Sequence, residues 1–293
     1  SYTMFGFNGQ YPGPMLRVPQ GAHVVVRFHN ALPLPSTVHW HGLRLDARFD
    51  GVPGLSQLAV EPGESFTYHL VFPDGGIFWY HPHVREDIQQ DLGLYGNIFV
   101  QPSRPDAWGP VHREEFLILD DLLVGEDGLV PWGRDAPTHA AMGRFGNLLL
   151  VNGEPDWRLQ VRQGEVVRLF LTNVSNTRTF NLSFGAGARL KVVGSDLGNF
   201  VRESWAESVV IGPAERYVVE VRFEEPGPVA MLNAVQGQDH MNGRFFPVVD
   251  TLGVVTVGQE RARPDLAQNF GALRTDRFVA DETTELLRAN QAL

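Results

Sequence analysis

The sequence contains no cysteine among its 293 residues. This absence excludes disulfide bonds, thiolate zinc sites and cysteine nucleophiles within the chain. It also excludes a blue-copper centre, which needs two histidines and a cysteine thiolate. Lysine is nearly absent too, since Lys191 is the only one among 24 basic residues. No apolar run approaches the roughly 18 residues of a membrane-spanning helix.

Acidic residues outnumber basic ones by 34 to 24, which gives a net charge of −10. This balance disfavours nucleic acid as a partner, because phosphate binding needs a basic surface. Apolar residues make up 43% and charged residues 20%, as in folded globular proteins. The length predicts two domains. The first ten residues lack a charged start and an apolar stretch, so we expect no signal peptide in this chain.

An internal duplication organises the chain. Residues 8–30 resemble residues 152–173, and the alignment has no gaps once Leu16 is placed on Leu159. A second similarity follows between residues 61–72 and residues 212–223. An offset of about 150 residues is too long for a solenoid repeat and fits a duplicated domain.

Short runs of alternating apolar residues, separated by Gly, Pro and Asn, predict an all-β protein of the sandwich or barrel type. The predicted strands lie within residues 23–30, 64–72, 97–102, 165–173, 215–223 and 251–257. The expected organisation is a first domain at 1–102, a second at 103–258 and a linker-like tail at 259–293. The tail is more polar and ends in one short predicted helix.

Two histidine pairs carry the chemistry, His39 with His41 in HWHG and His81 with His83 in WYHPH. Residues i and i+2 of a strand point to the same face, so each pair offers two imidazoles to one side. Neutral imidazole is a ligand for zinc, copper, iron and nickel. Four histidines without cysteine favour a copper or zinc site.

A single HxH pair arises by chance in many proteins, but two pairs beside aromatic residues are much less expected by chance. The duplicated half tests a purely structural role. Its matching segments, TFNLSF at 179–184 and VAMLNAV at 229–235, contain no histidine, so the fold does not require these imidazoles. The remaining histidines are expected in strands, at the surface or in loops: His23, His29, His69, His112, His139 and His240.

The segments HWHGLRLDARFDGVPGLSQ and FWYHPHVREDIQQDLGLYGNIFVQP resemble the first domain of multicopper oxidases, the laccase-like enzymes. FNGQYPGP and GRFGNLLLVNGEP are similar to the same family, and the resemblance covers about residues 1–258. It implies two cupredoxin-like Greek-key β-sandwich domains. It also implies a location outside the cytoplasm.

The resemblance implies a role for each histidine. His39 matches a ligand of the type 2 copper, and His41, His81 and His83 match ligands of the paired type 3 coppers. Together they form half of the trinuclear cluster that reduces dioxygen to water. Asp50 matches an acidic residue that delivers protons to the cluster; the alternative is a turn residue in Asp-Gly. Carboxylate partners for the second ring nitrogens stay open among four candidates: Asp46, Glu86, Asp87 and Asp91.

The chain departs from the family pattern where a third domain would supply the other cluster histidines and the type 1 copper cysteine. We therefore interpret it as the two N-terminal domains of a three-domain oxidase, inactive alone. The third domain would be omitted, cleaved or supplied as another chain. The expected partners are dioxygen, a small phenol-like or metal-ion reductant, and this domain. The alternative is a non-catalytic copper-binding scaffold. We also expect Trp40, Trp79 and Tyr80 to be exposed near the histidines.

Overall fold

The computed structural model describes residues 3–185, 187–196, 198–239 and 241–291. Its strands are β1 (Leu16–Pro19), β2 (His23–His29), β3 (His39–His41), β4 (Ser65–Val71), β5 (Gly76–His81), β6 (Gly96–Gln101), β7 (Arg113–Leu122), β8 (Val124–Gly125), β9 (Gly128–Leu129), β10 (Leu148–Val151), β11 (Trp157–Gln163), β12 (Glu165–Asn173), β13 (Phe180–Phe184), β14 (Leu190–Ser195), β15 (Gly198–Ala206), β16 (Val209–Ile211), β17 (Arg216–Phe223), β18 (Gly227–Asp239) and β19 (Arg244–Arg261). The helices are η1 (Ala47–Phe49), α1 (Glu86–Gln89), α2 (Ala136–Met142), α3 (Ala267–Gly271) and α4 (Arg277–Gln291).

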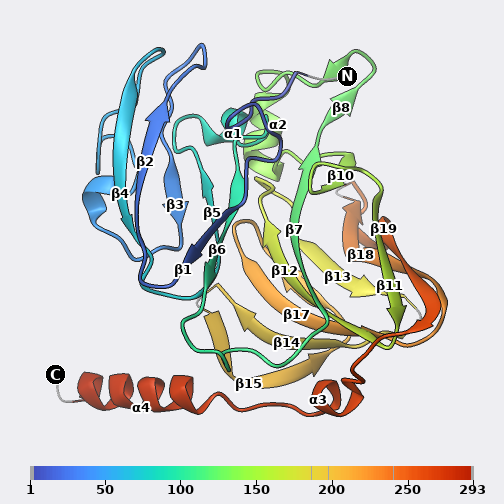
Figure 1. Ribbon diagram of the computed structural model, residues 1–293. Helices are drawn as coiled ribbons and strands as arrows, with labels where there is room; N and C mark the ends of the chain where they lie inside the picture. Colours follow the sequence, from blue (N-terminus) through green and yellow to red (C-terminus); the bar gives the residue numbers. More distant parts are fainter. Residues whose placement is uncertain (1–2, 186, 197, 240, 292–293) are drawn as a thin grey trace.

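Strands β1 to β6 form the N-terminal sandwich, at the left of Figure 1. A four-stranded sheet of order β1-β6-β5-β3 packs against the β2-β4 pair. Side chains of both sheets, such as Trp40, Tyr68 and Tyr80, fill the space between them. Burial of these large aromatic groups supplies the main favourable energy of this core.

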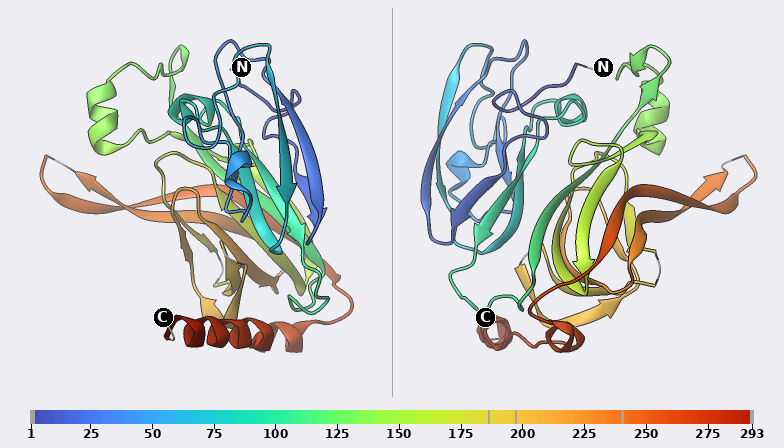
Figure 2. Two further views of the ribbon diagram at one scale, coloured as in Figure 1. Left: turned by 90° about the vertical axis from the view of Figure 1, so that its left-hand side faces the viewer. Right: turned by 45° about the vertical axis from the view of Figure 1, so that its right-hand side comes forward.

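Strands β7 to β19 form the C-terminal sandwich. A six-stranded sheet of order β10-β7-β12-β17-β14-β15 faces a five-stranded sheet of order β11-β19-β18-β13-β16, with one apolar core between them. The long β18–β19 hairpin projects beyond the body of the protein (Figure 2). The all-β prediction is confirmed, and the six predicted strands fall in β2, β4, β6, β12, β17 and β19.

The structure repeats the pattern of the sequence duplication. β2 pairs antiparallel with β4 as β12 pairs with β17, and β1 lies parallel to β6 as β11 lies parallel to β19. The matched residues Asn30 and Asn173 are both fully buried at the ends of their strands. Asn30 Nδ2 donates to the backbone oxygen of Val60, and Asn173 Nδ2 donates to that of Ile211. The two halves therefore share a corner built on one buried amide.

Strand β5 joins the two sandwiches because both of its faces are buried. Phe78 and Tyr80 point into the N-terminal core. Ile77 packs with the C-terminal strand residue Phe170, and Trp79 packs with Ile118. The face of β5 that meets the C-terminal sandwich is therefore the face that continues, two residues on, to His81.

The tail is anchored to the C-terminal sandwich by the chain's single lysine. Lys191 is 2% exposed, and its Nζ donates to the backbone oxygens of Asn269 and Ala272. Arg104 binds the carboxylate of Asp276 just before α4. The helix predicted in the tail corresponds to α4, and the tail with α3 and α4 runs along the bottom of Figure 1 below both sandwiches. In the described part of the chain, no helix is both long and apolar enough to cross a membrane.

Candidate metal centre

Strand pairing brings the two histidine motifs together. β3 lies antiparallel to β5, with His39 opposite His81 and His41 opposite Trp79. Alternation along each strand then places these four rings on one face. Ring nitrogens of His39, His41 and His81 all lie within 4.8 Å of one another. Such a group of donors could hold a metal ion.

His83 completes the group, although it follows the end of β5. Its ring centroid lies 4.7 Å from that of His39 and 5.2 Å from that of His81. The structure therefore brings together all four histidines that the sequence predicts, here called the imidazole cluster. His81 is the most buried of them at 4% exposure, and Trp79 stacks on its ring at 4.1 Å.

Second-nitrogen contacts orient three of the rings. His39 Nδ1 donates to the backbone oxygen of Asp50 at 2.7 Å, and the Asp50 carboxylate lies 3.2 Å from the same nitrogen. His81 Nδ1 donates to the backbone oxygen of Pro82 at 2.9 Å. His83 Nδ1 lies 3.3 Å from the carboxylate of Glu86. Each contact favours a proton on Nδ1 and leaves the lone pair of Nε2 as the potential metal ligand.

His41 is oriented differently. Its Nδ1 lies 3.3 Å from Nε2 of His81, so two potential ligand atoms from different strands face each other. Its ring also packs against Trp79, with 4.9 Å between the ring centroids. The two nitrogens cannot both carry a proton at this distance without repulsion.

Burial favours the unprotonated form of three of these rings, those of His39, His41 and His81. Desolvation, with a smaller contribution from the nearby guanidinium of Arg216, lowers the pKa of His41 to about 3. Desolvation also lowers the pKa of His81 well below its usual value and lowers that of His39, which Asp50 partly offsets. A neutral imidazole is the form that binds a metal.

Asp50 lies in a tight turn and also contacts His39. It ends the short helix η1 and precedes Gly51, whose φ of +76° forms the turn. A side chain at Gly51 would place its Cβ 2.0 Å from the backbone oxygen of Val38. This tight turn holds Asp50 against His39.

Glu86 alone among the four candidate carboxylates contacts the imidazole cluster in the described structure. Asp46 accepts from Arg48 and begins η1, while Asp87 accepts from Arg85. The sequence could not separate these candidates, because their spacing from the histidines does not show which way each side chain turns.

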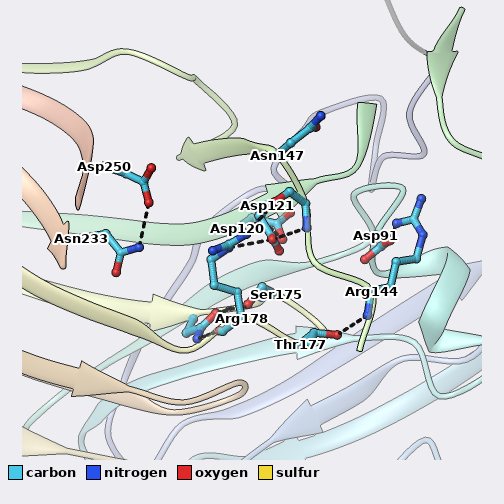
Figure 3. A network of polar contacts seen from close by, with 12 residues as sticks. Asp91, Asp120, Asp121, Arg144, Asn147, Ser175, Thr177, Arg178, Asn233 and Asp250 are labelled. Atoms are coloured by element: carbon cyan, nitrogen blue, oxygen red, sulfur yellow. Dashed lines mark hydrogen bonds and ion pairs between the residues drawn. The ribbon is translucent and has the colours of Figure 1, made fainter. Parts of the chain in front are cut away.

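Asp91 instead joins the two sandwiches, a role the sequence did not suggest. Its carboxylate accepts from Arg144 Nη1, from Trp132 Nε1 at 3.1 Å and from Asn176 Nδ2 at 2.7 Å. Figure 3 shows Arg144 extending toward Asp91 beside the Asp121–Arg178 pair. Because Asp91 lies just after α1, these donors hold the segment that carries Glu86.

Two expectations are wrong. Trp40, Trp79 and Tyr80 are only 2%, 1% and 4% exposed. Strand alternation turns Trp40 and Tyr80 into the N-terminal core, and the C-terminal sandwich covers Trp79. His139 lies in helix α2 and not in a loop; His240 lies outside the described residues.

The residues fit copper by their chemistry. The imidazole cluster provides four imidazoles, and the second nitrogens of His39, His81 and His83 are held by a backbone oxygen or a carboxylate. Imidazole is a preferred ligand of copper. Ordered second-nitrogen contacts are typical of metal-binding histidines.

Comparison with known proteins gives a consistent answer. Residues 1–105 and residues 132–248 each match a family model described as multicopper oxidase. Copper resistance protein A of Pseudomonas syringae pv. tomato is 38% identical over 281 residues, which cover 81% of this chain and 45% of that protein. The protein of the same name from Escherichia coli is 36% identical over 258 residues, 73% of this chain and 42% of that protein. This chain thus spans less than half the length of these two relatives.

The crystal structure of a multi-copper oxidase from Pseudomonas thermotolerans superimposes with a TM-score of 0.74 at 34% identity. The match covers 88% of this chain and 59% of that chain. The cupredoxin fold predicted from the sequence is confirmed by this likeness. With the two family matches covering more than half of its residues, the chain belongs to the multicopper oxidase family, whose members bind copper.

Proposed function

We propose that this chain is the N-terminal two-domain part of a laccase-like multicopper oxidase and supplies half of its trinuclear copper cluster. The observation that carries the proposal is the convergence of ring nitrogens from His39, His41 and His81 within 4.8 Å, with His83 beside them. We assign His39 to the type 2 copper and the other three to the type 3 pair. The proposed parts are residues 1–102, 103–258 and a tail at 259–293.

Bound copper would supply the electron transfer that reduces dioxygen to water. The chain's own residues would prepare the site for it. The desolvated imidazoles of His41 and His81 stay neutral and can bind a metal. Asp50 and Glu86 orient the other two rings through Nδ1 of His39 and of His83. The Asp50 carboxylate is 35% exposed, so it can exchange protons with solvent while it contacts His39. We propose it as the proton-delivering group.

Electrons must come from elsewhere, because no cysteine is present to hold a type 1 copper. We propose that a third cupredoxin domain, in the same or another chain, supplies this copper and the remaining histidines. It would also take electrons from a small phenol-like or metal-ion reductant. We propose a location outside the cytoplasm for the complete protein, by its likeness to the family.

A copper titration followed by an oxygen-electrode assay tests this function. The wild-type chain should bind copper tightly in competition with a chromophoric chelator, and His81→Ala should weaken that binding. His23→Ala, which changes an exposed histidine of β2, is the matched control and should bind like wild type.

Oxygen consumption should be absent for the chain alone and should appear when a cupredoxin domain with the type 1 cysteine and the other histidines is supplied. Tight copper binding without oxygen consumption in that complete assembly would instead identify a copper-binding scaffold. Unchanged copper binding in His81→Ala would contradict the assignment of the site.

A further inference from the structure

The C-terminal sandwich places one buried cation directly beneath the HWHG motif. Arg216, the first residue of β17, is 3% exposed. The guanidinium group extends out of its own sandwich toward the turn that follows His41. A buried charge is costly unless it is paired and hydrogen-bonded, so its partners show what it does.

The guanidinium of Arg216 is fixed by contacts in both sandwiches. Its Nη1 donates to the backbone oxygen of Ala214 and to Oδ1 of Asp196, both at 2.9 Å. Its Nη2 donates to the backbone oxygen of Asp196 at 3.2 Å. In the other direction, Nε donates to the backbone oxygen of Ile77 in β5 at 3.3 Å. These contacts leave the group little freedom to move.

The same guanidinium lies against Gly42, the residue after His41. A Cβ added to Gly42 would lie 2.4 Å from Nη2 of Arg216, closer than two such atoms can approach. Gly42 also has a φ of +84°, which favours glycine. The end of β3 therefore packs directly against the guanidinium of Arg216, which belongs to the C-terminal sandwich.

We propose that Arg216 is a positioning residue for the metal centre, holding the turn after His41 so that this ring stays within the imidazole cluster. This inference rests on the proposed copper-binding function and adds a role for the sandwich that carries none of the four histidines of the imidazole cluster. The C-terminal sandwich would thus position the imidazole cluster through one side chain, which is hydrogen-bonded to β5 and packs against the end of β3.

Charge and position make opposite predictions for the loss of Arg216. By Coulomb's law alone, removing a nearby cation would strengthen the binding of a copper ion. Loss of support for His41 would weaken that binding, and substitutions of residues that orient metal ligands typically cost about 10- to 100-fold in affinity. The sign of the change therefore separates the two roles.

The test measures copper(I) affinity by chelator competition in three proteins: wild type, Arg216→Met and Arg168→Met. Arg168 is the matched control because it is equally buried, at 3%, but pairs with Glu114 and Glu220. We expect Arg216→Met to bind copper at least about tenfold more weakly. Arg168→Met should retain the wild-type copper affinity, even if the substitution lowers the stability of the fold.

Equal or tighter copper binding by Arg216→Met would overturn the positioning role. An equal loss of copper affinity in Arg168→Met would also contradict the positioning role, because any buried arginine would then have the same effect. Absence of binding in the wild-type chain would overturn the proposed function itself, which distinguishes the two failures.

A double-mutant cycle with Gly42→Ala gives a second readout that does not depend on Arg216→Met alone. In the wild-type background, the added Cβ should displace the guanidinium and weaken copper binding. In the Arg216→Met background, the same substitution should cost markedly less, because the flexible methionine can move aside. Additive effects of the two substitutions would contradict the contact.

Discussion

Protonation of His41 should make the metal-free protein sensitive to acid. In the folded chain the pKa of His41 lies at about 3, below its usual value of 6.5. Above pH 6.5 the ring is neutral in both the folded and the unfolded chain, so this stability is fully present. As the pH falls from 6.5 toward 3, the His41 ring is protonated in the unfolded chain but not in the folded chain, and this stability is lost.

The size of the effect follows from about 1.4 kcal/mol per pKa unit. At about pH 5, His41 should lower the free energy of unfolding by about 2 kcal/mol relative to neutral pH. Urea unfolding of the metal-free chain at both pH values measures this loss. His41→Gln cannot be protonated, so its loss between the two pH values should be smaller than that of wild type by this amount.

His23→Gln is the control, because His23 is an exposed residue at the start of β2 and should leave the pH dependence as in wild type. Equal pH dependence in wild type and His41→Gln would refute the reasoning. It would mean that the His41 ring is protonated in the folded protein at little cost.

Three further outcomes are expected. Gly51→Ala should destabilise the chain by about 1–3 kcal/mol and weaken copper binding, since the new Cβ would collide with the backbone of Val38; a melting temperature like that of wild type would contradict this. Lys191→Met should lower the free energy of unfolding by about 1–3 kcal/mol, because the backbone oxygens of Asn269 and Ala272 lose their donor while Glu220 keeps Arg168 as a partner; urea unfolding measures it, and no loss would show that the tail anchor is dispensable. Free copper at 100 times its dissociation constant should add about 2.7 kcal/mol of stability, reversed by a chelator; calorimetry showing no shift would mean that the folded site does not bind it.

Strand alternation explains why much of the fold and site could be predicted. The duplicated segments fixed the correspondence of β2 with β12, and the i, i+2 spacing put each histidine pair on one face. The same rule, applied to Trp40, would have turned it to the opposite face and into the core, where the structure has it. Trp79 does lie on the face of the histidines, and it is buried because the C-terminal sandwich covers it.

Contacts between distant segments could not be predicted. Arg216 approaches Gly42, and Asp91 collects donors from three separate parts of the C-terminal sandwich. No periodic pattern or motif spacing in the sequence indicates either contact, because each depends on how the two sandwiches pack against each other. Glu86 could be named only as one candidate among four, since the direction of its side chain depends on the turn before α1.

Anomalous diffraction at the copper edge, from crystals of the copper-loaded chain, tests the central claim most directly. The account predicts copper peaks bonded to ring nitrogens of His39, His41, His81 and His83. Crystals of His81→Ala grown alike should lose occupancy at these positions. Copper bound only at other residues, or strong peaks that persist in His81→Ala, would contradict the assignment of the metal centre.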